Sequence, residues 1–281
     1  MLPGDLIQPE LDMGLVVLSF LISVLGCFVA LMALSRMERQ ASRQWLGYIL
    51  VAAIAYGGVG VWGMHFIAMT AQVMPIPVAY DAWSTIISLG VAVAGTALAL
   101  WVFSFSFSLG LRCYLAGLLL SIASLAMHFI GVHATRMYGY FEWDTGRVAA
   151  ACLLAMVVIP FLLRLAWLAT STRQRLLIAA CFAITINAMH HLAVSASTIV
   201  CTTPRALEGW LLNGDYLPYI VFFIAGVTLV VLGSELFLHR TQTGLAAGES
   251  RTFKTGPHAA PAAGCPPRWR FLPWGGPAAK K

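Results

Sequence analysis

Residues 62–69 read Trp-Gly-Met-His-Phe-Ile-Ala-Met and place a Met-His pair inside a long apolar stretch. The same pair returns at Met127-His128 and at Met189-His190, so that successive histidines are 63 and 62 residues apart. Ionisable side chains are rare inside membrane-length apolar segments, and those that occur there usually belong to a functional site. A period this constant indicates an internal repeat that supplies one histidine per unit.

The composition is that of an all-α, polytopic membrane protein. Hydrophobic residues make up 60% of the 281 residues and charged residues 10%, whereas about a quarter of the residues in soluble domains are charged. Apolar stretches of about 20 residues, long enough for a helix to cross a bilayer, recur along the chain. They predict seven transmembrane helices, at residues 13–35, 46–71, 82–105, 113–134, 148–169, 176–200 and 216–238.

The repeat period covers two of these helices, which returns the chain to the same side of the membrane. The predicted architecture is therefore three two-helix repeats followed by a final helix. Each Met-His pair falls in the second helix of its unit, in the half that runs toward the outside. We therefore expect His65, His128 and His190 at similar depth on three equivalent helices.

Arginine residues are distributed unevenly between the two sides of the predicted bundle. The positive-inside rule assigns the arginine-rich loops to the cytoplasm, which places the N-terminus outside and the C-terminus in the cytoplasm. The basic residues behind the net charge of +6 are distributed according to the side of the membrane on which they lie. The charge therefore predicts the lipid bilayer and not nucleic acid as the partner. The arginines of the predicted cytoplasmic loops are Arg36, Arg39, Arg43, Arg112, Arg173, Arg175 and Arg240.

Three segments follow from this pattern: an outer N-terminal segment at 1–12, the seven-helix membrane domain at 13–240, and a tail at 241–281. The tail is rich in glycine, alanine and proline and carries scattered basic residues. It predicts a disordered cytoplasmic segment, either solvated or held to anionic lipid. The six cysteines include no CxxC pair and predict neither a disulfide framework nor a zinc knuckle.

The histidines are the predicted metal ligands, with methionine sulfurs beside them. His65 and Met69 are four residues apart and share a helix face. Met64 is turned by about 100° from His65 and more easily faces a neighbouring helix. The predicted ligand set is His65, His128 and His190, with sulfur ligands drawn from Met69, Met64, Met127 and Met189.

Imidazole and thioether together favour copper over calcium or magnesium, which take oxygen ligands. Methionine shifts the preference toward Cu(I), while imidazole alone would also suit zinc or iron. Three imidazoles without further ligands would leave a coordination position for a small molecule such as O₂, CO or NO. For any single histidine the alternative is a hydrogen bond to a neighbouring helix, but the threefold recurrence argues against that alternative for the set.

The stretch at 64–69 resembles the signature of the MHYT domain, which is named for a Met-His-Tyr-Thr motif, and the three Met-His pairs are similar to its three motifs. The resemblance covers residues from about 10 to 240. It implies a bacterial inner-membrane sensor that binds copper and responds to diatomic gases or oxygen. Val132 and Val194 stand where the later motifs have methionine, and His191 takes the aromatic position of the third motif. The family is often fused to cyclic di-GMP or histidine-kinase modules, and because none follows here, the resemblance implies a separate cytoplasmic partner.

We therefore expect a membrane sensor more than an enzyme. Copper would sit near the periplasmic face, and binding of O₂, CO or NO, or a redox change, would shift the helix packing that a cytoplasmic partner reads. The alternative is a membrane copper-handling protein or a copper redox metalloenzyme. A third interpretation, a proton or ion pathway, is disfavoured because few acidic residues fall inside the predicted spans. The oligomeric state stays open.

Overall fold

The computed structural model describes residues 4–37, 45–105, 107–203 and 209–254. Within these ranges seven helical segments are long and apolar enough to cross a membrane, which confirms the predicted all-α, seven-helix architecture. The helices are α1 (Met13–Met37), α2 (Trp45–Ala53), η1 (Ile54–Gly63), α3 (Met64–Thr70), α4 (Ala82–Phe103), α5 (Leu109–His133), α6 (Thr145–Leu168), α7 (Thr172–Ser195) and α8 (Leu217–Lys254). The second span is the continuous run of α2, η1 and α3, in which η1 is a π-helix.

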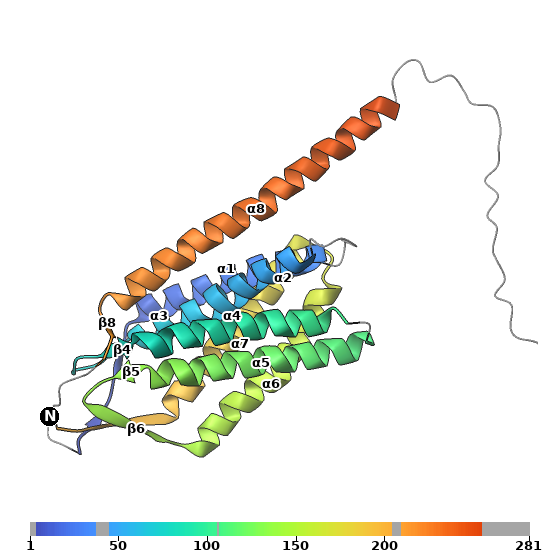
Figure 1. Cartoon of the computed structure of the whole chain (residues 1–281). Coiled ribbons are helices and arrows are strands. Elements are labelled where there is room, and N and C mark those ends of the chain that lie inside the picture. Colours follow the sequence, from blue (N-terminus) through green and yellow to red (C-terminus); the bar gives the residue numbers. More distant parts are fainter. Residues whose placement is uncertain (1–3, 38–44, 106, 204–208, 255–281) are drawn as a thin grey trace, which may run out of the picture. The chain divides into compact units, whose positions relative to one another are not determined.

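The first six spans form a closed ring in chain order. Each span packs against the next, and α7 closes the ring by packing against α1. The helices run alongside one another in Figure 1, with the strand labels gathered at one end of the bundle. At that end α3 also contacts α5 and α7, so the second, fourth and sixth spans meet in the middle of the ring.

Small sheets cover this end, which we call the strand-bearing end. The sequence predicts loops there, except at residues 197–200, which it assigns to the end of the sixth span. That assignment is wrong: α7 ends at Ser195, and these four residues pair as a strand. The described part of the chain forms three sheets, in the strand orders β1-β7-β6, β2-β3 and β5-β4-β8. The strands are β1 (Leu6–Ile7), β2 (Glu10–Leu11), β3 (Gln72–Val73), β4 (Ala79–Asp81), β5 (Thr135–Arg136), β6 (Gly139–Trp143), β7 (Ser197–Cys201) and β8 (Leu211–Asn213).

The threefold repeat extends to individual hydrogen bonds. In each unit an aspartate precedes the first helix, and its side chain accepts hydrogen bonds from backbone N–H groups of the first helical turn. The backbone N–H of the same aspartate donates, at 2.8 Å in every unit, to the alanine that ends the second helix. The three bonds join Asp12 to Ala71, Asp81 to Ala134, and Asp144 to Ala196. Each alanine follows its repeat's histidine by six residues, so this bond fixes the histidine's depth relative to the partner helix.

Close helix contact in the first unit depends on two glycines. A Cβ atom on Gly26 of α1 would come within 2.6 Å of the backbone of η1, at Ala55 and Gly60. A Cβ atom on Gly57 of η1 would come within 2.4 Å of the Ala92 carbonyl oxygen on α4. The π-helix is thus held between α1 and α4 at backbone contact distance, which small residues permit in membrane helices.

The C-terminal part of α8, from Leu238 onward, belongs to a second unit that is separate from the helical bundle. The helix runs through residues 241–254, a stretch for which the sequence predicts disorder. The remainder of the predicted tail, 255–281, lies outside the described residues. The proposed division into three segments otherwise stays a prediction.

The Asp81 cap gives a test of the repeat bonds. Hydrogen bonds from the Ser84 hydroxyl and from the Ser84 backbone N–H hold the pKa of the Asp81 carboxyl below its ordinary value. We expect Asp81→Ala to lower the free energy of unfolding by about 1 kcal/mol, because the first turn of α4 loses its cap. Asp81→Asn, which retains a capping oxygen, serves as the control, and thermal unfolding in nanodiscs is the measurement.

The pH dependence of this effect has a defined sign. A carboxyl whose folded-state pKa is depressed stabilises the fold above its unfolded pKa of about 3.9 and loses that contribution as the pH falls through the lower folded value. The difference in stability between the wild type and Asp81→Asn should therefore shrink as the pH is lowered below about 4. A difference that grows on acidification would contradict this assignment.

Candidate metal centre

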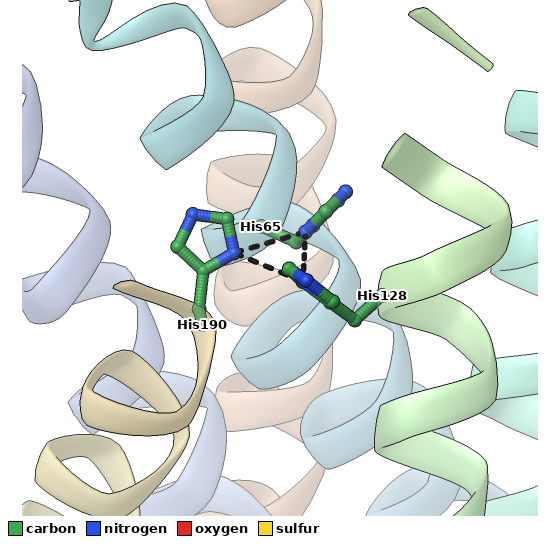
Figure 2. A group of neighbouring side chains, drawn as sticks. All are labelled: His65, His128 and His190. Atoms are coloured by element: carbon green, nitrogen blue, oxygen red, sulfur yellow. Dashed lines mark hydrogen bonds between the residues drawn. The ribbon is translucent and has the colours of Figure 1, made fainter. Parts of the chain in front are cut away.

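Three imidazoles converge where the second, fourth and sixth spans meet. The Nδ1 atom of His65 lies 3.1 Å from Nδ1 of His190 and 3.3 Å from Nδ1 of His128, and the third distance is 3.2 Å. The rings stand nearly perpendicular to one another, at 83–88°, with their Nδ1 atoms facing a common centre (Figure 2). All three side chains are fully buried. We call them the histidine triad.

Hydrogen bonds alone do not satisfy this arrangement. The Nδ1 atom of a neutral imidazole carries either one hydrogen or one lone pair, both directed in the ring plane. Among three such atoms that face one centre, only one donor–acceptor pair can align. The third nitrogen then carries the same group as one of the other two, so that either two hydrogens or two lone pairs face each other. A cation at the centre removes the conflict, because all three nitrogens then present lone pairs to it.

The nitrogen spacing also fits a metal ion. Tetrahedral nitrogen ligands at about 2.0–2.1 Å from a metal are separated from each other by about 3.3 Å. The triad's separations of 3.1–3.3 Å match this value closely. Three ligands on one side leave a fourth tetrahedral position, the arrangement of sites that bind an exchangeable ligand. The triad is therefore able to hold a metal ion, and its geometry does not name which one.

The residue after each histidine packs against it in the same way. His65 meets Phe66 edge-on at 4.8 Å between ring centroids, and His128 meets Phe129 at 5.1 Å. His190 meets His191 at 5.0 Å with an interplanar angle of 82°. His191 thus occupies the aromatic position of its motif in geometry as well as in sequence. These rings shield the triad and fix the orientation of each imidazole.

The outer nitrogen of each triad ring faces protein without a hydrogen-bond partner. Nε2 of His65, of His128 and of His190 are buried and unpaired among the described residues. Gly131 of α5 lies against the first of them: a Cβ atom there would come within 2.3 Å of His65 Nε2. This glycine is not among the site residues predicted from the sequence. Its spacing of three residues from His128, on the same helix face, is the signal that could have found it.

The four predicted methionine ligands are all buried. Met64, Met127 and Met189 are each 1% exposed and Met69 is 3% exposed. Met69 also lines a cavity of about 440 Å³ at the strand-bearing end, together with Met74 and Tyr80. Among the histidine, cysteine and carboxylate groups of the described residues, the three imidazoles are brought to one point. A methionine contribution to the ligand set stays a prediction.

Six helices arranged as three units around a buried group of histidines define a repeat-built membrane protein with a candidate metal centre. Two stretches, 58–117 and 120–180, match the family model for the bacterial signalling protein N-terminal repeat, MHYT. The chain therefore carries two repeats of the MHYT family. The first two Met-His pairs fall inside the matched stretches, and the third, at Met189-His190, completes the triad from outside them.

Curated relatives are bacterial signalling proteins. The chain is 28% identical over 229 residues to the bifunctional diguanylate cyclase/cyclic di-GMP phosphodiesterase MucR of Pseudomonas aeruginosa, a match that covers 80% of this chain and 33% of the relative. It is 26% identical over 226 residues to an uncharacterized signaling protein of Caulobacter vibrioides, covering 79% of this chain and 27% of the relative. It is 31% identical over 147 residues to the cyclic di-GMP phosphodiesterase NbdA of Pseudomonas aeruginosa, covering 51% and 18%.

The chain therefore spans a third or less of the length of these relatives. No solved structure matches it.

Gly131 provides a test of the triad's geometry. We expect Gly131→Ala to displace the His65 ring, because the added methyl would overlap Nε2, and to weaken metal binding by about tenfold or more. Gly110→Ala, on the same helix with open space around the added Cβ, is the matched control. Metal affinity of the purified variants is the measurement, and equal affinity of the two variants would contradict this geometry.

Proposed function

We propose that this protein is a bacterial inner-membrane sensor that binds copper through His65, His128 and His190. The N-terminus and the strand-bearing end face the periplasm, and the C-terminus is cytoplasmic, as the arginine distribution indicates. The observation that carries the proposal is the convergence of three buried Nδ1 atoms at 3.1–3.3 Å, which a cation satisfies and hydrogen bonds do not.

The charge of the site favours the cuprous ion. The triad consists of neutral ligands, it is fully buried, and no carboxylate belongs to it. Because the cost of burying an ion rises with the square of its charge, a monovalent ion pays about a quarter of the Born penalty of a divalent ion. Cu(I) therefore fits this site better than Zn²⁺ or Cu²⁺. Buried methionines in the same helical turns suit a soft ion as well.

The surroundings of the triad select the kind of ligand that can reach it. Phe66, Phe129 and His191 pack on the imidazoles and exclude bulk water. A charged ligand would lose its hydration on entry, whereas a neutral diatomic molecule loses little. Copper, when bound, supplies the open coordination position that O₂, CO or NO can take. The residues of the chain hold the ion and keep that position dry.

The output is proposed by analogy with the relatives, two of which are named as enzymes that make or hydrolyse cyclic di-GMP. A change at the triad would shift the packing of the second, fourth and sixth spans. A cytoplasmic signalling partner, with activity of the same kind, would detect that shift at the opposite ends of these helices.

One observation favours the alternative, a copper-handling protein or a copper redox metalloenzyme. Met69, one turn beyond His65, lines the cavity at the strand-bearing end, and Met74 lines it too. Two thioethers on the wall of this cavity would suit an ion that is passed onward. Transfer of Cu(I) from the loaded protein to an acceptor, or sustained turnover, would favour this alternative over the sensor.

Metal loading tests the proposed site. Purified protein loaded with Cu(I) under anaerobic conditions should retain one ion per chain. It should prefer Cu(I) to Zn²⁺ because burying a monovalent ion costs less than burying a divalent one. Replacement of His65, His128 and His190 together by Ala should abolish retention. His133→Ala, at the exposed end of α5, is the control. Copper content that survives the triple replacement would overturn the proposed site.

Gas binding tests the proposed stimulus. Infrared spectroscopy of the Cu(I)-loaded protein under CO should show one carbon monoxide stretching band that disappears when the gas is removed. The band should be absent from the triple histidine variant. A loaded protein that binds neither CO nor NO would eliminate the gas-sensing part of the proposal and leave the copper site standing.

A further inference from the structure

The helix that carries His65 differs from the other two histidine helices. Directly before Met64 it forms a ten-residue π-helix, η1, with the sequence Ile-Ala-Tyr-Gly-Gly-Val-Gly-Val-Trp-Gly. The Met64 backbone N–H donates to the Val59 carbonyl, five residues back, and to the Val61 carbonyl, three residues back, in place of the usual acceptor four residues back. α5 and α7 are α-helical through the equivalent stretches. Wide turns of this kind are uncommon and concentrate at functional sites.

A widened turn leaves carbonyl groups without their usual partner. In an α-helix the Gly60 carbonyl would accept from the Met64 N–H, which here donates to Val59 and Val61 instead. The hydroxyl of Ser23 on α1 donates to the Gly60 carbonyl at 2.8 Å, and both groups are buried. Ser23 is fully enclosed, so water does not compete for this bond. The bond compensates the carbonyl that the π-helix releases.

η1 is also anchored on its other side. The Trp62 indole N–H donates to the Thr85 carbonyl at 3.2 Å and to the Ser88 hydroxyl at 3.1 Å, both on α4. The π-helix is therefore tied to both neighbouring helices through polar contacts, a few residues before the histidine. Its widening is stabilised by the surrounding bundle.

The widening decides which residue faces the triad. Backbone hydrogen bonds join residues five apart in a π-helix and four apart in an α-helix. Changing from the first to the second shifts the residues that follow by about one position, which rotates them by about 100° around the helix axis. If η1 closed to an α-helix while α2 kept its place, His65 would turn away from the centre. The position that it leaves would be taken by a neighbouring side chain of the motif.

We propose that Ser23 is a positioning residue for the metal centre: its bond to the Gly60 carbonyl holds η1 open and thereby keeps His65 on the triad. The inference rests on the proposed metal site for its effect on binding. Its structural part, the control of η1 by Ser23, does not depend on any metal.

The test compares two buried serines that each bond to a carbonyl of another helix. Ser23→Ala removes the bond to Gly60, and Ser121→Ala removes the 2.9 Å bond from α5 to the Ala155 carbonyl on α6, where no π-helix lies. Ser23→Cys, which keeps the size of the side chain and donates more weakly, is a second and milder variant. The full-length protein in nanodiscs is used throughout.

The first measurement is hydrogen exchange of the metal-free protein. Ser23→Ala should accelerate exchange of backbone amides at residues 57–64, because η1 loses its support, while Ser121→Ala should leave them unchanged. Unchanged exchange in Ser23→Ala would overturn the proposal. This measurement tests whether Ser23 supports η1, and it does so even if the wild type binds no copper. Failure of the wild type to bind copper would contradict the proposed function and not the role of Ser23 in supporting η1.

The second measurement is Cu(I) binding. Ser23→Ala should weaken Cu(I) binding by about tenfold or more, with Ser23→Cys between it and the wild type. X-ray absorption of the loaded variant should count two histidine ligands where the wild type has three. Ser121→Ala should keep three. Faster exchange at η1 together with three retained histidine ligands would overturn the positioning role.

Discussion

The structure depends on the need to satisfy three buried imidazole nitrogens at one point inside the bundle. An isolated histidine in a membrane helix can find a carbonyl on a neighbouring helix, but the triad turns its Nδ1 atoms toward one another. This requires three helices to approach one centre at the same depth. The closed ring of six helices, the edge-on rings around the triad and the close contact at Gly131 all follow from that requirement.

The depth is set at the strand-bearing end, by the repeated bond between a capping aspartate and a terminal alanine. The aspartate starts one helix and, through its backbone, holds the end of the next. Because the alanine is always six residues beyond the histidine, the three bonds bring the three imidazoles to one level without any contact at the triad itself. Repetition of one local rule thus produces a precise site from three separate parts of the chain.

The sequence predicted the helices and the histidines well because both depend on local pattern. Length and apolarity identify a span, and a fixed period identifies equivalent positions. It did not predict the strands, whose pairing joins residues as distant as Leu6 and Val200, nor the support of Gly60 by Ser23. The three capping aspartates stand beside the predicted spans in the sequence, but their role depends on the alanine partners that only the fold brings to them. The π-helix was not predicted, because glycine-rich stretches are common in membrane helices. Such a stretch does not by itself indicate whether the backbone bonds join residues four or five apart.

The restriction of the π-helix to one unit breaks the threefold equivalence of the centre. In a fully symmetric ring, a small change in bond lengths at the middle would push all three helices outward alike, and their tilts would cancel. Closing of the widened turn would rotate the second span, a movement that its two α-helical neighbours lack. Motion at the centre would then concentrate in the second span as a rotation and travel along it to Trp45 at the opposite end. The asymmetry would give such a movement a direction.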